Sequence, residues 1–206
     1  MAPPPPTSRP TRPRLAERYD RRQGELVRAA AAVFAEVGYD QTTIQDLAAA
    51  VDLAAGGIYH YVGSKERLLA MICDQLMDPL LEQARELLAT DAEPAIQLRA
   101  LVRLWVRHVT EHRDHMLVFQ QERHVIERGA QWKEVRASRK SFERLVEATI
   151  ERVGAAGGLR LGDNRLTLSA LLGMVNHTAQ WYRPRGRLSP EEIADGYVEL
   201  LLGLGA

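Results

Sequence analysis

The amino-acid sequence predicts an all-α fold, and three observations lead to this class. Apolar residues recur every three or four positions along almost the whole chain after residue 20, which is the spacing of a helix face. No segment keeps the alternation of apolar and polar residues that a half-buried strand shows. No internal repeat is visible either. We therefore expect about nine helices packed around a common core.

Length and composition fit a globular chain. The 206 residues are 46% hydrophobic and 26% charged, enough for one domain or for two small domains that share a core. Cys73 is the single cysteine, so we expect a fold independent of disulfides and a cytoplasmic location. Residues 166–182 lack Asp, Glu, Lys and Arg but carry other polar residues, which predicts a buried helix and no membrane span. No signal peptide is expected, because the N-terminus lacks an apolar segment.

Charge is unevenly distributed along the chain. The 27 basic and 27 acidic residues cancel, which by itself argues against a nucleic-acid partner. Residues 1–22, however, contain six arginines against Glu17 and Asp20, and residues 1–14 hold six of the ten prolines. We expect residues 1–19 to form a disordered, locally basic arm.

Helical periodicity begins at Asp20. The first helix should extend to just before Gly38, because apolar residues from Leu26 onward fall at i, i+4, i+7, i+8 and i+11 and the glycine can end the helix. Thr43, or Thr42 before it, offers an N-cap to a short second helix. After a break at residues 52–57, a third short helix is expected from about residue 55 to 61.

A long fourth helix should begin after a cap at Ser64 and run to Leu88. Pro79 lies inside it, which predicts either a kink near Asp78 or a new helix that starts with Asp78 as its cap. Further helices are expected at 94–112, 114–126, 131–153, 164–182 and 190–204. The last opens with Ser189, Pro190 and Glu192, a capping box with proline at the first position.

Three short helices before a long one, with a four-residue turn between the second and third, predict a helix-turn-helix unit over residues 20–67. Glycines 56 and 57 allow the third helix to approach a phosphate backbone, towards which its N-terminus points a positive dipole end. Tyr59, His60 and Tyr61 offer polar tips on flat rings, and Lys65 offers a charge to phosphate. The alternative is a packed helical corner with a purely structural role.

The motifs resemble one known family. Residues 42–48 (TTIQDLA), 57–61 (GIYHY) and 64–69 (SKERLL) resemble the DNA-binding domain of TetR-family transcriptional regulators, in the same order and spacing. The resemblance implies a homodimer that binds a palindromic site on double-stranded DNA, with residues 68–206 forming a ligand-binding and dimerisation domain. It implies that Thr43 and Tyr59 bind phosphates and that Lys65 binds a phosphate or base edge. The residues implied to face the major groove are Ala55, Gly56, Gly57, His60 and Tyr61.

Three departures from the family pattern affect four positions. Asp52 replaces the usual turn glycine, and it tolerates a left-handed conformation less readily than glycine does. Ala54 and Gly57 stand where a serine or threonine is common, so the third helix loses an expected cap and phosphate donor. Val62 replaces an aromatic residue. The basic arm could compensate by reaching phosphates or a minor groove, or it could be a solvated tail without function.

The C-terminal half suggests a ligand pocket. Aromatic residues on several predicted helices could line an apolar cavity that also contains a few polar groups, although most of them should be ordinary core and no more than half should line the cavity. The candidate ligand-binding residues are Trp105, His108, Phe119, Phe142, Asn176, Gln180 and Arg183. His108, His112 and His115 share a helix face, which would suit a metal, but the interleaved arginines favour a partly solvated face. We expect no metal and no cofactor.

Two features of the last third suggest an effector and a dimer. Residues 180–190 and the final helix are similar to TetR-type repressors that respond to CoA thioesters, which implies an acyl-CoA effector. Arg183, Arg185 and Arg187 could bind its phosphates, or they could cap the helix end and contact solvent or a partner subunit. Apolar stripes on the last two helices predict a four-helix dimer interface. The stripe of the final helix comprises Ile193, Tyr197, Leu200, Leu201 and Leu204.

These features predict a ligand-responsive repressor in which the effector shifts the long fourth helix, with Pro79 as a hinge. An enzyme is not expected, because the chain has no Glu-x-x-His pair for a di-iron site, no glycine-rich phosphate loop and no nucleophile elbow. The alternative is a helical-bundle metal- or ligand-binding protein that lacks DNA-binding activity.

Overall fold

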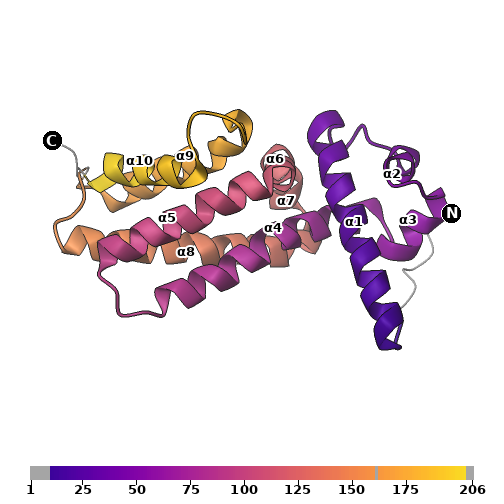
Figure 1. The fold of residues 1–206 in the computed structure, drawn as a ribbon, viewed down its shortest axis with the longest axis horizontal. Coiled ribbons are helices and arrows are strands. Elements are labelled where there is room, and N and C mark those ends of the chain that lie inside the picture. The colour runs from indigo at the N-terminus through magenta and orange to yellow at the C-terminus, as the bar shows by residue number, and fades with distance from the viewer. Residues whose placement is uncertain (1–9, 161, 203–206) are drawn as a thin grey trace.

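The computed structural model describes residues 10–160 and 162–202, and within them it confirms the all-α class. Ten α-helices and one short 3₁₀-helix, η1, make up this part of the chain (Figure 1). The bounds are α1 Pro13–Val37, α2 Ile44–Ala50, α3 Ala55–Val62, α4 Lys65–Leu88, α5 Pro94–Glu111, α6 Arg113–Gln121, α7 Arg123–Arg128, η1 Ala130–Trp132, α8 Lys133–Ala155, α9 Asn164–Trp181 and α10 Pro190–Leu202.

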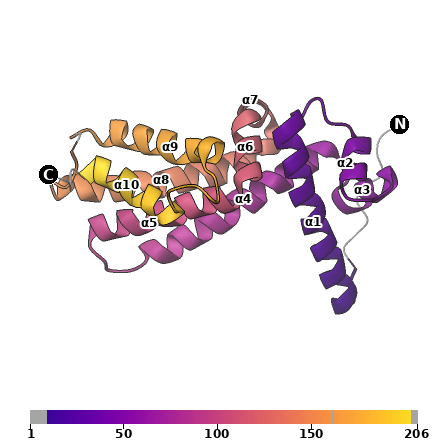
Figure 2. The ribbon, with the colours of Figure 1, turned by 45° about the horizontal axis from the view of Figure 1, so that its top comes forward.

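The helices form two packed groups. Helices α1, α2 and α3 lie at one end of the molecule, and α4 leads from them into a bundle with α5, α8, α9 and α10 (Figures 1 and 2). One hydrophobic cluster joins the first three helices to the start of α4 around Phe34, Leu47 and Ile58, all at most 1% exposed. A second cluster fills the bundle. Helix α1 runs across the end of the bundle and packs against α6.

Helix α1 begins earlier than the sequence pattern predicts. The structure places its first residue at Pro13, so residues 13–19 are helical and do not belong to a disordered arm. Proline is well tolerated at this first position, because its missing N–H would have no partner inside the helix. Ala16 is buried, which gives this extra turn a packing contact. Residues 1–9 of the predicted arm lie outside the described residues.

Helix α4 is continuous through Pro79. Of the two outcomes expected for this proline, the new helix start at Asp78 is therefore wrong. Asp78 instead accepts a hydrogen bond from the Ser138 hydroxyl of α8 at 3.2 Å. The flanking residues Met77 and Leu80 are buried against the bundle, and this packing offsets the backbone hydrogen bond that the proline removes.

The segment expected as one helix over residues 114–126 is two helices. Helix α6 ends at Gln121 and α7 starts at Arg123, which raises the number of helices from nine to ten within the described ranges. Glu122 separates them and is only 6% exposed. Its carboxylate accepts a hydrogen bond from the backbone N–H of Tyr39, 83 residues earlier in the chain. A tertiary contact thus fixes the break, which local periodicity could not indicate.

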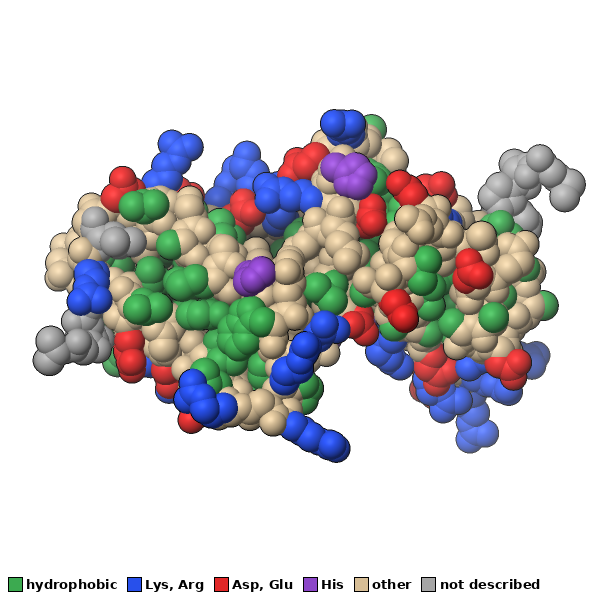
Figure 3. All heavy atoms as spheres, turned by 90° about the horizontal axis from the view of Figure 1, so that it is seen from above, with side chains coloured by type: hydrophobic (Ala, Val, Ile, Leu, Met, Phe, Trp, Pro, Cys, Tyr) green, Lys and Arg blue, Asp and Glu red, His purple; other side chains and the backbone are tan. Residues whose placement is uncertain are grey.

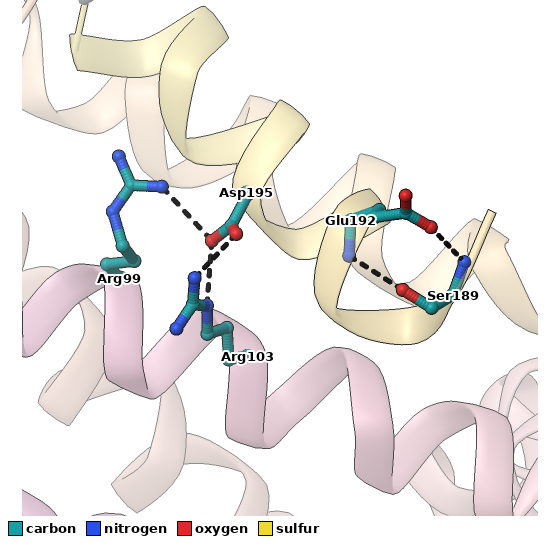
Figure 4. A network of polar contacts seen from close by, with 5 residues as sticks. All are labelled: Arg99, Arg103, Ser189, Glu192 and Asp195. Carbon is teal, nitrogen blue, oxygen red and sulfur yellow. Dashed lines mark hydrogen bonds and ion pairs between the residues drawn. The ribbon is translucent and has the colours of Figure 1, made fainter.

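The last two helices start where capping residues predict. Asp163 caps α9 by accepting from the backbone of Leu166 at 2.9 Å. The expected capping box of α10 is formed: Ser189 N donates to Glu192 at 2.7 Å, and Glu192 N donates to the Ser189 hydroxyl at 3.2 Å (Figure 4). Asp195 ties α10 to α5 by accepting from Arg99 and Arg103. Leu204 lies outside the described residues.

No helix in the described ranges is long and apolar enough to cross a bilayer.

Candidate nucleic-acid interface and effector cavity

The N-terminus of α2 is closed by a capping box between Thr43 and Asp46. The Asp46 carboxylate accepts from Thr43 N at 2.8 Å and from the Thr43 hydroxyl at 2.7 Å, while the Thr43 oxygen accepts from Asp46 N at 3.2 Å. These hydrogen bonds lower the pKa of Asp46, and the bond from the Thr43 backbone N–H has the largest effect. Thr43 is therefore the N-cap that the sequence predicts, and it is exposed at the surface.

The turn between α2 and α3 contains one residue in the left-handed conformation, at the position where Asp52 replaces the glycine usual in the family. Asp52 has φ 51°, and among the described residues it is the one non-glycine with positive φ. Leu53 N then donates to Ala48 O at 3.0 Å, which closes the turn. Ala54 is the N-cap of α3 and provides no side-chain hydrogen bond, as expected for alanine at this position. The turn is thus formed with backbone strain at Asp52 and without a side-chain cap at Ala54.

Helix α3 presents one face to solvent. Ile58 and Val62 are fully buried and anchor the helix in the first cluster. Gly56 and His60 are exposed, and a Cβ at Gly56 would meet no atom within 4 Å. The remaining candidates, Ala55, Gly57, Tyr59, Tyr61 and Lys65, are partly exposed. The sequence-predicted DNA-binding residues therefore lie at the cap of α2, along α3 and at the first position of α4.

Helix α1 holds the C-terminal end of α3. The Tyr19 hydroxyl donates to the carbonyls of His60 and Tyr61, both at 3.3 Å, and Gln23 Nε2 donates to the Tyr61 carbonyl at 2.7 Å. The Tyr19 and Tyr61 rings also pack at 5.0 Å between centroids. Sequence reasoning missed Tyr19 by placing it in the arm. Its spacing of four residues from Gln23 and seven from Leu26 was the signal that it belongs to the same helix.

Lys65 points back towards the loop before α2. Its ammonium lies 4.4 Å from the centre of the Tyr39 ring and 3.5 Å from the Asp40 carbonyl. A cation over an aromatic ring is held in position without losing its charge. Lys65 is thus positioned at the edge of the surface formed by α2 and α3.

The bundle contains a small interior cavity of about 30 Å³. Four of the seven predicted ligand-binding residues line it: Trp105, Phe119, Phe142 and Asn176. The other lining residues are Met77, Leu80, Met116, Arg139, Glu143 and Leu172. Gln180 lines a separate outer groove, and Arg183 lines a third hollow in the loop after α9. A volume of this size holds about one water molecule, so a ligand could enter only if the core opened.

His108 does not line the cavity. Its Nε2–H donates to the Leu76 carbonyl at 2.7 Å, and its ring stacks on that of His112 with 4.2 Å between centroids. Burial lowers the pKa of His108 and of His115 to about 4, so both are neutral at pH 7. No group of three or more His, Cys, Asp or Glu in the described part of the chain is arranged to hold a metal ion.

Arg139 and Glu143 place charges beside the cavity, and sequence reasoning missed both. Arg139 Nη1 donates to Glu127 of α7 at 2.8 Å, and its Nε lies 3.5 Å from a Glu143 oxygen. The Nε atom is buried and has no hydrogen-bond acceptor among the described residues. Charged residues on a polar helix face give no signal in the sequence that they border a cavity.

Helix α6 contacts both the bundle and the N-terminal helices. Met116 and Phe119 on one side line the cavity. On the other side the Gln121 side chain donates to the Ala35 carbonyl of α1 at 3.4 Å, and Glu122 at the helix end accepts from Tyr39 N. Phe119 packs against both hydrophobic clusters. Helix α6 thus contacts the cavity on one side and α1 with the loop that follows it on the other.

A helix-turn-helix surface joined to a helical bundle with an interior cavity defines the class of two-domain DNA-binding regulators. Residues 26–72 match the family described as bacterial regulatory proteins, tetR family, and residues 91–204 match the tetracyclin repressor-like C-terminal domain. The chain belongs to the TetR family and is a transcriptional regulator. This membership supports the regulator over the alternative of a bundle without DNA-binding activity.

Relatives cover almost the whole chain. The HTH-type transcriptional repressor KstR2 of Mycobacterium tuberculosis strain H37Rv is 25% identical over 194 residues, covering 92% of this chain and 96% of the relative. KstR2 of Rhodococcus jostii is 28% identical and covers 88% and 89%. The solved structure of AibR in complex with isovaleryl coenzyme A and operator DNA has a TM-score of 0.75 at 30% identity, covering 88% of this chain and 98% of that chain. The structure of M. tuberculosis KstR2 shares the fold, with a TM-score of 0.81 at 24% identity, and covers 88% and 93%.

Proposed function

We propose that this regulator is a homodimeric repressor that leaves a palindromic operator when an acyl-CoA effector opens the cavity. The observation that carries the proposal is the position of α6, which lines the cavity with Met116 and Phe119 and contacts α1 through Gln121 and Glu122. An effector that pushes on α6 would change the angle of α1 and, with it, the position of α3. The protein acts as a regulator and not as an enzyme, in the cytoplasm where the chromosome lies.

The DNA-binding surface is the one formed by the start of α3 and the cap of α2. The N–H groups of Ala55 and Gly56, the first two of α3, can meet phosphate, whereas Gly57 N already donates to the Ala54 carbonyl at 2.8 Å; Gly56 also leaves room for a close approach. His60 is exposed on the same helix and can reach a base edge. The residues proposed to contact DNA are Thr43, Ala55, Gly56, Gly57, Tyr59, His60, Tyr61 and Lys65.

The first turns of α1 add positive charge to this surface. Arg14, Arg18 and Arg21 are exposed on the helix that holds α3 through Tyr19. Arg22 has a structural role instead, because it donates to the Val51 carbonyl at 3.0 Å and pairs with Glu25. If Arg14, Arg18 and Arg21 bind phosphates, replacing them by alanine should make operator affinity less dependent on salt. The slope of log affinity against log salt concentration should fall by about 0.9 for each phosphate contact that is lost. An unchanged salt slope would show that they have no role in binding.

Dimerisation is assigned to α9 and α10. Leu166 and Leu200 are 55% and 58% exposed, and Trp181 is 43% exposed. Gly173 and Gly196 lie on the same two helices, where a Cβ would meet no atom within 4 Å. Figure 3 shows hydrophobic side chains gathered over this half of the molecule. Large apolar residues beside small ones allow two helices of a partner to approach closely. A monomer in light scattering at micromolar concentration would contradict this assignment.

The effector class follows from the cavity and from AibR. The cavity wall is mostly apolar, with Arg139 and Asn176 as hydrogen-bond donors, which suits an apolar acyl group with one carbonyl. AibR, 30% identical to this chain, was solved with isovaleryl coenzyme A. We therefore propose an acyl-CoA as the effector of this chain.

The test has two stages. Selection of bound genomic DNA fragments by the purified protein first identifies the operator. Fluorescence polarisation of that labelled operator then follows the addition of a panel of acyl-CoAs, with free CoA as the control. The proposal expects one or more acyl-CoAs to release the DNA while free CoA does not. A protein without sequence-specific DNA binding, or one that no acyl-CoA releases, would contradict it.

A further inference from the structure

A polar groove lies on the outer side of the cavity wall. It has a volume of about 530 Å³ and runs between α6 and α9. Its lining residues are Arg113, Leu117, Gln120, Gln121 and Gln180. Four of these five are polar, whereas the cavity behind them is lined mostly by apolar side chains. An open polar groove therefore lies beside a small and mostly apolar cavity.

Gln120 forms the boundary between the two spaces. Its Nε2 donates to the backbone carbonyl of Asn176 at 2.6 Å, and its Oε1 accepts from Gln180 Nε2 at 3.3 Å. Asn176 lines the cavity, and Gln120 and Gln180 line the groove. Phe119, the residue before Gln120, also lines the cavity. Gln120 is therefore the groove residue that bonds directly to the cavity wall.

We propose that the α6–α9 groove binds the polar, anionic tail of the effector, while the acyl group occupies the cavity and the thioester passes beside Gln120. The inference rests on the acyl-CoA effector proposed above. The arm of CoA next to the thioester carries two amides, which can take over the hydrogen bonds that Gln120 and Gln180 make to each other and to Asn176. Arg113 at the groove offers a guanidinium for the phosphates beyond these amides.

A second basic hollow competes for the same tail. It has a volume of about 220 Å³ and lies in the loop after α9, where Arg183 and Arg187 line it. Neither the loop hollow nor the α6–α9 groove shares a lining residue with the cavity, but the groove residue Gln120 donates a hydrogen bond to the backbone carbonyl of Asn176, which lines the cavity. Arg113 has Asp114 as a neighbour at 3.4 Å, a weak pair with both side chains well exposed. A phosphate can therefore compete for this arginine, and the α6–α9 groove is the better candidate.

Two probes separate the tail from the acyl group. Isovaleryl-CoA carries both, and the N-acetylcysteamine thioester of isovaleric acid keeps the acyl group and one amide but lacks the phosphates. Titration calorimetry of the full-length protein should give a lower Kd for isovaleryl-CoA. Arg113→Gln should raise that Kd by about tenfold, the effect of removing one charge-assisted hydrogen bond, and leave the Kd of the short thioester unchanged. Arg183→Gln removes the same charge from the competing hollow and should change neither value.

A kinetic measurement tests Gln120. Trp105 lines the cavity, so its fluorescence should report arrival of the acyl group. In a stopped-flow experiment, Gln120→Ala should speed association of the short thioester by about tenfold, because two hydrogen bonds no longer close the wall. Gln83→Ala, the same change at an exposed position of α4 that lines neither the groove nor the cavity, should leave the rate near that of the original chain.

The outcomes distinguish the groove from the effector. If both probes bind but Arg183→Gln, and not Arg113→Gln, weakens isovaleryl-CoA, the tail lies in the loop hollow and the groove assignment is wrong. An association rate that Gln120→Ala does not change would also overturn the proposed entry path. If neither thioester binds at millimolar concentration, the acyl-CoA effector itself is wrong, and the groove assignment falls with it. Thermal melting of each variant verifies that it is folded.

Discussion

Tyr19 connects the DNA-binding helix to the rest of the first domain through its hydroxyl. That group donates to two carbonyls at the end of α3, which no longer have partners inside the helix. Burial raises the pKa of Tyr19, and the neighbouring Tyr61 raises it further, so the Tyr19 hydroxyl remains a hydrogen-bond donor at neutral pH. The same residue type stands at position 59, where the side chain is partly exposed on the proposed DNA surface.

These two tyrosines should respond differently to loss of the hydroxyl. Tyr19→Phe keeps the ring packing but leaves the carbonyls without that donor, and should lower the free energy of unfolding by about 1 kcal/mol. Tyr59→Phe should leave stability unchanged and weaken operator binding. Urea denaturation and fluorescence polarisation measure the two effects. Equal stability losses in both variants would show that position 59 is structural.

The buried histidines predict a loss of stability in acid. The pKa of His108 and of His115 is about 4 in the folded chain, against 6.5 for an unperturbed histidine. Between these values the unfolded chain binds protons that the folded chain excludes. The stabilisation from these groups is therefore complete above about pH 6.5 and is lost as the pH falls towards 4. His108→Gln, which keeps a donor for the Leu76 carbonyl, should reduce this slope in urea denaturation curves measured from pH 7 to 4. Parallel curves for the two proteins would contradict the assignment.

At the scale of the element, the starts of α2, α4 and α10 were predictable because their signals are local, whereas the start of α1 at Pro13 was not predicted. Thr43, Ser64 and Ser189 each bond a backbone N–H three residues ahead, so the residue type and spacing identify the cap. The break at Glu122 was not predictable, because a contact 83 residues away fixes it. Arg139 was missed for a related reason. Its place beside the cavity depends on how α8 packs against the other helices, which its own neighbours in sequence do not reveal.

Helix α3 lacks the cap that its neighbours have, and supplying one should stabilise it. Ala54→Ser places a hydroxyl at the N-cap and should raise the free energy of unfolding by about 1 kcal/mol. Ala49→Ser, the same change inside the exposed face of α2, should instead lower it by about 0.5 kcal/mol. Thermal melting separates the two. A destabilised Ala54→Ser would mean that the hydroxyl cannot reach the α3 backbone.

At the scale of the whole molecule, a buried hydrogen bond links the two domains: Tyr39 N donates to the Glu122 carboxylate, and we propose that it helps to carry the effector's signal. Glu122→Ala leaves a buried N–H without its acceptor, which should cost about 2 kcal/mol of stability and loosen α6 from the loop before α2. Operator release should then require more effector than in the original chain. Glu122→Gln keeps an acceptor oxygen and serves as the control. If both variants release DNA at the original effector concentration, the signal travels through α4 instead.

The sequence indicated this two-domain arrangement correctly but not the route between the domains. Motifs in α2, α3 and α4 define the first domain, since each residue acts within one turn or one helix. The route depends on α6 lying between the cavity and α1, a relation among helices distant in sequence. Pro79, the hinge that the sequence suggested, lies in a continuous helix.

The interior cavity measures only about 30 Å³, so packed side chains leave almost no free space for a ligand. Each effector must therefore separate packed side chains, and part of its contact energy is used to expand the core. In the mechanism proposed above, that expansion also displaces α6. A variant with a larger cavity would bind the same effector more tightly, but the effector would then displace α6 less. The compound that binds most tightly and the compound that releases DNA most effectively therefore need not be the same.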